Sequence, residues 1–224
     1  AGVAIEAVGK SREGATGLAL ITVDEQGENM IVVSPGANAA LRPDEVAGAA
    51  RLLDEAAVTL VQLEIRPDTV AAAAAASGGR VILNPAPARP LEPSLLDLVD
   101  ILVPNRTELG VLAGAPEPAT LEEAAALAGS LEGPGAVIVT LGSDGALVVE
   151  GGEVLHVPSV PVASVDPTGA GDAFCAGLAD ALVRGAALPE AAGWAVRCGA
   201  AATLRWGAQA ALPTRDDVER LEEA

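Results

Sequence analysis

Two carboxylates bracket a run of residues with little or no side chain, in the stretch DPTGAGDAF at 166–174. Apolar residues follow at helical spacing, so this run leads into the first turn of a helix. The first N–H groups of a helix lack intrahelical partners and lie at the positive end of its dipole, so an anion can approach them closely. Asp172 can accept a proton there from an attacking hydroxyl, while the N–H groups stabilise a transferring phosphoryl group. A glycine-rich turn with Asp172 as a simple N-cap fits the same residues.

Three further polar segments follow predicted strands. Glu64 comes after a short apolar strand at 58–63, PNRTE after 100–103, and GSDG after 136–141. The DPTGAGD segment itself follows a strand that we predict near 162–165. Ligands of parallel sheets bind where strands pass into loops at their carboxyl ends. Four polar loops on one such edge therefore predict a binding site.

The elements that must position these loops alternate between strands and helices. We expect helices at 44–56, 67–79 with the final glycines as its end, 120–131, 172–185, 189–205 and 214–223, and a further strand at 80–84. Thr120 and Glu123 have the spacing of a capping box at the start of one helix. Hairpins are predicted at 16–36 and, around Gly151 and Gly152, at 146–158. Strands alternating with helices favour an α/β fold with a mostly parallel sheet covered on both faces.

Composition excludes several classes of partner. The chain has 224 residues, half of them hydrophobic, which favours a single domain with one substantial core. The formal net charge is −18 and no cluster of Lys and Arg exists, so neither nucleic acid nor an anionic membrane is expected as a partner.

No apolar run reaches transmembrane length. Cys175 and Cys198 lack CxxC spacing and are expected to be buried thiols, so we predict a cytoplasmic protein.

The stretch DPTGAGDAFCAGLADAL resembles the C-terminal signature of the ribokinase family of carbohydrate kinases. Other segments follow in that family's order: the block at 16–41, QLE at 62–64, VPNRTEL at 103–109, VTLGSDGALV at 139–148 and RWGAQAALP at 205–213. The resemblance covers essentially the whole chain. It implies a three-layer α/β/α fold with a partial β lid. It also implies ATP-dependent phosphorylation of a sugar's primary hydroxyl, with D-ribose as the first candidate for the sugar.

The resemblance assigns a role to each loop. Asp172 would be the general base and would also contact the sugar, together with Glu64. The anion hole would comprise Gly169, Ala170 and Gly171. Glu108 would order Mg²⁺ through water. The nucleotide would be bound by Asn105, Thr140, Leu141, Gly142, Ser143, Asp144, Gly145, Gly171 and Val196.

A monovalent cation such as K⁺ is implied near the anion hole. Its ligands would come from Asp166, Thr168, Ala202, Arg205 and Gly207. The chain departs from the family pattern at Ala211, where ribokinases can offer a hydroxyl. It departs again at Val196, where an Asn or His often meets the adenine. His156, in a strand pattern, is expected to be a surface residue.

The front of the chain also differs from the family pattern. A first strand and a glycine-rich GGKGAN-type sugar-binding segment are absent from the sequence, so we interpret residues 1–224 as one domain that is incomplete at its N-terminus. The hairpin at 16–36 would form part of a lid, with possible homodimer contacts. Two alternatives stay open: another sugar or nucleoside kinase of the family, and a truncated, non-catalytic chain that binds nucleotide.

Overall fold

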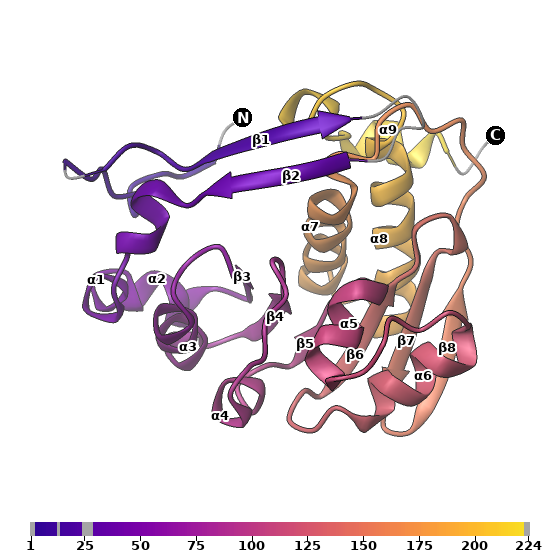
Figure 1. Cartoon of the computed structure of the whole chain (residues 1–224), viewed down its shortest axis with the longest axis horizontal. Coiled ribbons are helices and arrows are strands. Elements are labelled where there is room, and N and C mark those ends of the chain that lie inside the picture. The colour runs from indigo at the N-terminus through magenta and orange to yellow at the C-terminus, as the bar shows by residue number, and fades with distance from the viewer. Residues whose placement is uncertain (1–2, 13, 24–28, 222–224) are drawn as a thin grey trace.

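The computed structural model describes residues 3–12, 14–23 and 29–221 (Figure 1). Within them, one sheet has six strands in the order β3-β4-β5-β6-β7-β8. The pairs from β3 to β6 are parallel, and β7 and β8 add to the edge in antiparallel fashion, which confirms a mostly parallel sheet. The bounds are β3 (Val58–Gln62), β4 (Arg80–Asn84), β5 (Ile101–Leu102), β6 (Ala136–Thr140), β7 (Ala146–Glu150) and β8 (Glu153–Val157).

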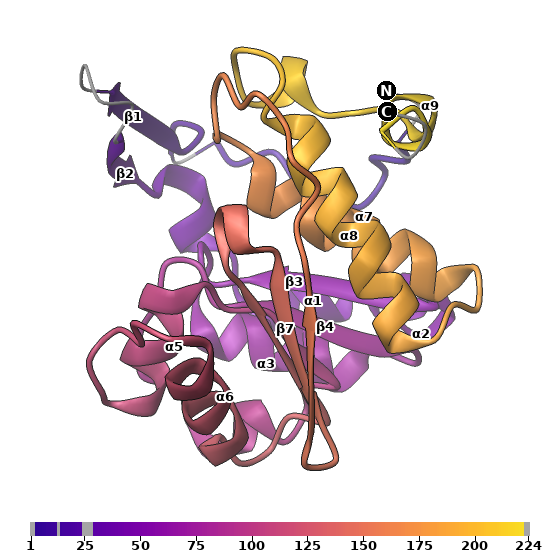
Figure 2. The same cartoon turned by 90° about the vertical axis from the view of Figure 1, so that its right-hand side faces the viewer.

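Helices cover both faces of this sheet. In β6, Val137 and Val139 pack into one cluster, while Ala136 and Ile138 pack into the other. Successive side chains of a strand point to opposite faces, so a strand buried on both sides is apolar throughout. On one face lie α3 (Pro67–Ala76), α5 (Arg106–Ala113) and α6 (Leu121–Ser130), and on the other α7 (Ala170–Val183) and α8 (Leu188–Ala202) (Figure 2). The three-layer α/β/α prediction is confirmed.

Local signals explain where the helices begin. Thr120 caps α6 in the predicted capping box: its side chain accepts from the Glu123 N–H at 3.1 Å, and the Glu123 carboxylate accepts from the Thr120 N–H at 3.3 Å. The single helix predicted at 44–56 is wrong, because α1 (Pro43–Ala47) ends at Gly48 and α2 (Ala50–Glu55) begins two residues later. Glycine is a poor helix former, which favours the break at this position. The remaining helices are α4 (Pro93–Leu96), α9 (Arg215–Glu219) and the 3₁₀ turns η1 (Gly36–Ala40), η2 (Gly142–Asp144) and η3 (Gln209–Ala211).

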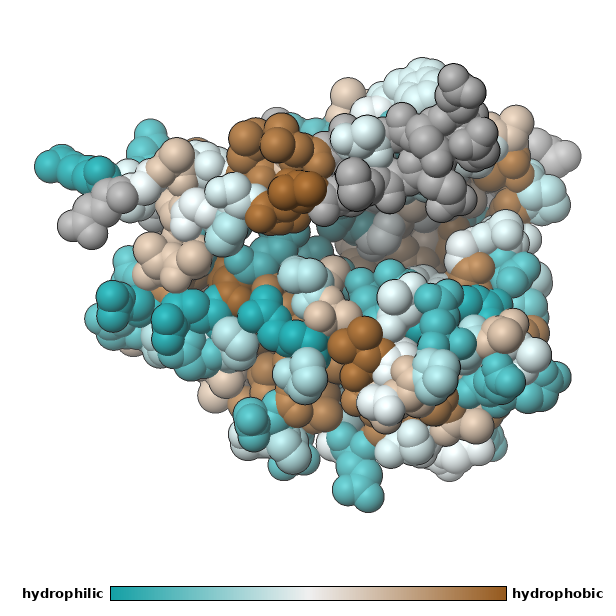
Figure 3. Space-filling model, in the orientation of Figure 1, coloured by the Kyte–Doolittle hydropathy of each residue, from teal (hydrophilic) through white to brown (hydrophobic). Residues whose placement is uncertain are grey.

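The N-terminal hairpin stands apart from the main sheet. Strands β1 (Leu18–Val23) and β2 (Asn29–Ser34) pair antiparallel, as predicted, and the turn at 24–28 lies outside the described residues. Exposed apolar side chains gather on it (Figure 3): Leu18, Leu20, Val32 and Val33. Leu20 is 60% exposed, whereas most apolar side chains of the main sheet are buried. The hairpin is therefore an apolar surface that the described residues leave uncovered.

Among the described residues, no helix combines the length and the apolar character that a membrane span requires. The longest, α8, has 15 residues.

Candidate active site

A pocket of about 640 Å³ lies where the C-terminal end of β6 meets the N-terminus of α7. It is lined by residues from several distant segments, and many of them were predicted from the sequence to bind nucleotide. The predicted nucleotide residues among them are Asn105, Thr140, Gly142, Ser143, Gly145, Gly171 and Val196, and Ala170 was predicted for the anion hole. The fold thus brings three of the polar loops and one face of α8 together around a single cavity.

The N-terminus of α7 presents unpaired donors toward this pocket. Ala170 N donates to Pro167 O at 3.1 Å and Ala173 N donates to Gly169 O at 2.9 Å. Among the described residues, the N–H groups of Gly171 and Asp172 have no such acceptor. A side chain at Gly171 would meet nothing within 4 Å, so the backbone there is open to a ligand. Gly169 caps the helix at φ +81°, a conformation that favours glycine.

The loop after β6 is a tight turn held against β8. Gly145 has φ +91°, and a Cβ on it would lie 2.1 Å from the carbonyl oxygen of Val157, so only glycine fits. Arg106 Nη2 donates to Asp144 Oδ2 at 3.0 Å, which joins this loop to the start of α5. His156, which is exposed, places Nε2 2.6 Å from the Asp144 carbonyl oxygen. These contacts connect the loop after β6 to the start of α5 and to β8.

Two predicted nucleotide residues lie outside the pocket lining. The Leu141 side chain is 6% exposed and belongs to the core on the α5 and α6 face. Asp144 is exposed and directs its carboxylate to Arg106. Any contact that Leu141 makes with a ligand is through its main chain.

Asn105 and Glu108 form a reciprocal cap at the start of α5. Glu108 N donates to Asn105 Oδ1 at 2.7 Å, and Asn105 N donates to Glu108 Oε2 at 2.8 Å. Burial raises the pKa of the Glu108 carboxyl, and the Asn105 N–H opposes that rise. No group of three or more His, Cys, Asp or Glu side chains gathers to bind a metal in the part of the chain that the structure describes. Mg²⁺ often keeps its waters and uses one or two carboxylates plus phosphate oxygens, so a water-mediated site at Glu108 fits this donor set.

The segment before α7 is irregular, so the strand predicted near 162–165 is wrong. Val165 N and Asp166 N both donate to Thr203 O, at 2.7 and 3.2 Å, and these bonds run to the end of α8 rather than to a strand. Residues 159–164 instead form one wall of the pocket, with Val160 and Val162 among its lining. The prolines in PSVPVAS, which cannot donate to a strand ladder, were the signal for this.

Asp166 ties this segment to the loop after α8. Its Oδ1 accepts from Thr168 N and its Oδ2 accepts from Gly207 N, both at 2.9 Å. The Gly207 N–H, followed by the contacts with Thr168, holds the pKa of the Asp166 carboxyl below its usual value. Three of the five residues predicted for a monovalent cation therefore lie together.

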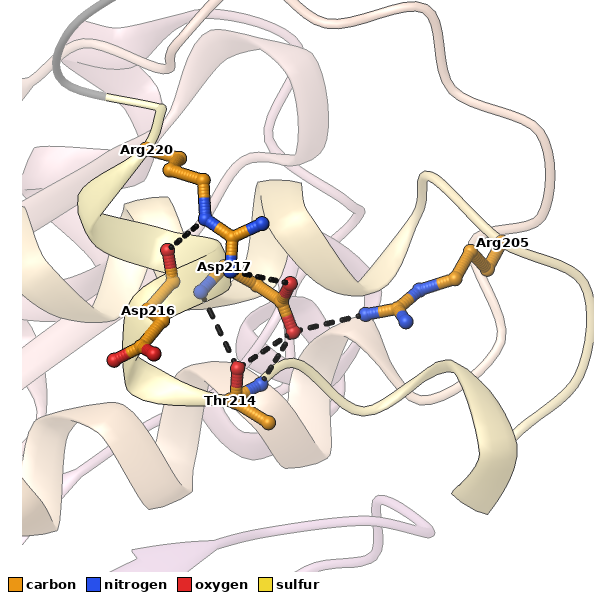
Figure 4. A network of polar contacts seen from close by, with 5 residues as sticks. All are labelled: Arg205, Thr214, Asp216, Asp217 and Arg220. Atoms are coloured by element: carbon orange, nitrogen blue, oxygen red, sulfur yellow. Dashed lines mark hydrogen bonds and ion pairs between the residues drawn. The ribbon is translucent and has the colours of Figure 1, made fainter.

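The other two predicted cation ligands lie at and after the end of α8. Ala202 is fully buried near that end. The Arg205 guanidinium donates to Asp217 Oδ2 at 3.2 Å, so only its main chain is open to a cation (Figure 4). Asp217 Oδ2 also accepts from the N–H and hydroxyl of Thr214, at 2.9 and 2.7 Å. This network anchors the loop after α8 to α9. Ala211, the departure noted in the sequence, is fully buried.

The predicted sugar residues lie beside the pocket rather than in its lining. Glu64 is exposed and follows β3, which is the edge strand of the sheet. Asp172 is exposed in the first turn of α7. Sequence reasoning missed another part of the pocket wall, since Phe174, Gly199, Ala200 and Thr203 read as ordinary helix residues.

The two thiols are buried, as predicted. Burial, followed by the negative charge of Asp172, raises the pKa of Cys175 to about 12. Burial, followed by the charge of Asp180, raises that of Cys198 to about 11. Neither thiol is a nucleophile at neutral pH, because the thiolate is the reactive form.

Comparison with known proteins places this geometry in a family. Residues 1–215 match the family model described as pfkB family carbohydrate kinase. The chain is 36% identical to a ribokinase of Schizosaccharomyces pombe over 226 residues, which is 97% of this chain and 71% of that protein. It is 37% identical to a ribokinase of Bacillus subtilis, over 88% of this chain and 65% of that protein. The chain thus spans about two thirds of the length of these relatives.

Solved structures agree with these matches. A ribokinase of Arabidopsis thaliana, in complex with ribose and ATP, superposes with a TM-score of 0.83 at 32% identity, covering 93% of this chain and 70% of that one. A ribokinase of Thermotoga maritima superposes with a TM-score of 0.82 at 35% identity, covering 94% of this chain and 71% of that one. The chain belongs to the pfkB family of carbohydrate kinases.

Proposed function

We propose that the protein transfers the γ-phosphoryl group of ATP to the primary hydroxyl of D-ribose, forming ribose 5-phosphate and ADP. The observation that carries this is the unpaired α7 N-terminus at the edge of the 640 Å³ pocket, with Asp172 in its first turn. The similarity to several ribokinases supports ribose as the sugar, and the Arabidopsis relative was solved with ribose and ATP.

Each part of the site has a task in this reaction. The apolar side chains of Val160, Val162 and Val196 face the base, and the glycine loop at 142–145 faces the phosphates. The N–H groups at the start of α7 stabilise the charge of the transferring phosphoryl group. Asp172 takes the proton from the sugar hydroxyl as its oxygen bonds to phosphorus and the bond to the ADP oxygen breaks. Asn105 and Glu108 would hold Mg²⁺ through water, and the ion supplies neutralising charge to the phosphates when bound.

A coupled assay that follows ADP release tests this function. We expect turnover with D-ribose at a typical enzyme rate of about 1–10³ s⁻¹. Competition with fructose and adenosine separates ribose from the substrates of other family members. Nucleotide binding without turnover on any of these acceptors would instead support a non-catalytic chain.

Deoxyribose is the second candidate substrate. The chain is 37% identical to a deoxyribokinase of Salmonella typhi, over 89% of this chain and 67% of that protein. A lower kcat/KM for ribose than for 2-deoxyribose in the same assay would favour this candidate.

K⁺ is proposed to order the loop that carries the anion hole. Asp166, Thr168 and Gly207 lie together there, and main-chain oxygens of Ala202 and Arg205 would complete the site. Activity should be higher in K⁺ than in Na⁺ or Li⁺, without a change in Mg²⁺ requirement. Equal activity in the three salts, or an Asp166→Ala variant that keeps the K⁺ response, would contradict this site.

The hairpin at 16–36 is proposed as a lid over the sugar and as a homodimer contact in a cytoplasmic enzyme. Its exposed apolar side chains, Leu18, Leu20, Val32 and Val33, support such a contact. Sedimentation of Leu20→Ser beside the parent protein tests it: the variant should shift toward monomer.

A further inference from the structure

Two amide side chains end neighbouring strands of the sheet beside Asp172. Gln62 is the last residue of β3 and Asn84 is the last residue of β4, and the two are register partners in the parallel ladder. Gln62 Nε2 donates to Asn84 Oδ1 at 3.2 Å. Both residues are half-buried. Their side chains therefore meet at the carboxyl edge of the sheet, where the candidate site lies.

The orientation of this pair is fixed from the interior. Asn84 Nδ2 donates to the carbonyl oxygen of Val103, just beyond β5, at 2.9 Å. An amide has distinct donor and acceptor ends, so this bond leaves Asn84 Oδ1 facing Gln62. Gln62 must then present its NH₂ group, rather than its oxygen, to Asn84. Gln62 therefore donates to Asn84, and Asn84 in turn donates to the backbone of Val103.

The same NH₂ group reaches the proposed base. Gln62 Nε2 lies 3.3 Å from Asp172 Oδ1 and donates its second proton to it. This contact joins residues 110 positions apart and connects β3 to the first turn of α7. It occupies one carboxylate oxygen and leaves Oδ2 for the proton of a substrate hydroxyl. Because the donor is neutral, it orients the carboxylate without forming an ion pair.

We propose that Gln62, oriented by Asn84, is a positioning residue that holds the Asp172 carboxylate in the rotamer needed for proton transfer, an inference that rests on the proposed kinase function. Asp172 is exposed, so its side chain has rotational freedom that this contact removes. Small misplacement of a reacting group is costly: about 1 Å can reduce a rate about 10²-fold. Gln62 does not touch the reacting atoms and acts through Asp172.

Gln62→Met removes the donor and keeps the length of the side chain. We expect kcat for ribose phosphorylation to fall about tenfold, which is less than the 10²-fold effect of a 1 Å misplacement. KM for ATP should stay within about twofold, because neither Gln62 nor Asp172 lines the proposed nucleotide pocket. Gln62→Glu keeps the shape but places a second carboxylate beside Asp172, so its kcat should fall further.

Thr59→Val is the matched control for a purely structural effect. Thr59 lies near the other end of β3, and its hydroxyl forms a 2.8 Å hydrogen bond with that of Ser77. This variant also loses a side-chain hydrogen bond of the same strand, so it should lower the melting temperature and leave kcat unchanged.

A double-mutant comparison separates positioning from general damage. If Gln62 acts through the carboxylate, Gln62→Met in an Asp172→Asn background should cause no further loss of the residual kcat. A wild type that fails to phosphorylate ribose would overturn the proposed function and this inference with it. An active wild type in which Gln62→Met keeps full kcat, or loses the same factor in both backgrounds, would overturn the inference alone.

Discussion

The proposed nucleotide side and the proposed sugar side of the site are built differently. The nucleotide side is a pocket of about 640 Å³ whose walls come from the ends of β6, α5, α7 and α8 and from residues 159–164. Its loops are joined by the Arg106–Asp144 ion pair and by the close approach of Gly145 to Val157. On the sugar side, Glu64 follows β3 at one edge of the sheet and Asp172 lies in the first turn of α7, and both side chains are exposed.

This difference suggests that nucleotide affinity and turnover depend on different groups of residues. In the proposed site, affinity for nucleotide would depend on backbone groups held by the core of the sheet, so it should survive changes at exposed side chains. Turnover, under the proposed mechanism, would depend on the exposed carboxylate of Asp172 and on the residue that positions it. Substitutions should therefore separate nucleotide binding from chemistry.

The largest separation is expected for Asp172→Asn. The substitution keeps the size of the side chain and removes the base, so kcat should fall about 10²- to 10⁴-fold. ADP affinity, measured by calorimetry, should stay within a few-fold. An Asn variant with near-normal kcat would contradict the role of Asp172.

Gly145→Ala should have the opposite effect and lower the affinity for ADP. Its positive φ and the 2.1 Å approach to Val157 O mean that the loop must move. Strain of this kind costs about 1–3 kcal/mol, so ADP affinity should fall with stability while the Asp172 side chain stays in place. Thermal melts and ADP titration measure both.

Gly151→Ala provides the control for that experiment. Gly151 also has a positive φ, +58°, but a Cβ there meets nothing within 4 Å, and it lies in the turn between β7 and β8. Stability should fall slightly and ADP affinity should not change. Equal losses of ADP affinity in both variants would show that the close contact at Gly145 is irrelevant.

Low pH should weaken the hydrogen bonds of Asp217 that connect the loop after α8 to α9. Hydrogen bonds from Thr214, followed by Arg205, lower the pKa of Asp217 to about 2. A carboxyl whose folded pKa lies below the unfolded value of about 3.9 contributes stability above that value, and the contribution is lost as pH falls toward 2. Asp217→Asn should lower the melting temperature at pH 6 and have less effect near pH 2.5. An equal change in melting temperature at both pH values would contradict a stabilising role for ionised Asp217.

The smallest effect is expected for the ion pair between the two nucleotide loops. The Arg106 side chain is 20% exposed and that of Asp144 is 60% exposed. Pairs open to solvent contribute about 0.2–1 kcal/mol. A double-mutant cycle with Arg106→Ala and Asp144→Ala should give a coupling in that range. A coupling above 2 kcal/mol would show that the pair is a main constraint on the nucleotide side.

Much of the fold could be predicted because local signals agree with packing. The Thr120 cap and the apolar strand at 136–140 each appear in consecutive residues. The break at Gly48 was missed because it depends on a modest helix propensity. The irregular path at 162–165 depends on hydrogen bonds to Thr203, and the local signal against a strand there is limited to the prolines. The contact between Gln62 and Asp172 joins residues far apart in the sequence, so spacing alone could not reveal it.

Calorimetric titration of the 224-residue chain with Mg·ADP and with D-ribose tests the difference between the two sides most directly. The nucleotide loops lie together around a formed pocket, whereas the predicted sugar contacts among the described residues are exposed. A hydrogen bond from an exposed side chain to a sugar hydroxyl contributes only about 0.5–1.5 kcal/mol. Mg·ADP should therefore bind saturably and ribose only weakly. Ribose binding as tight as that of Mg·ADP, or no binding of Mg·ADP, would contradict the account.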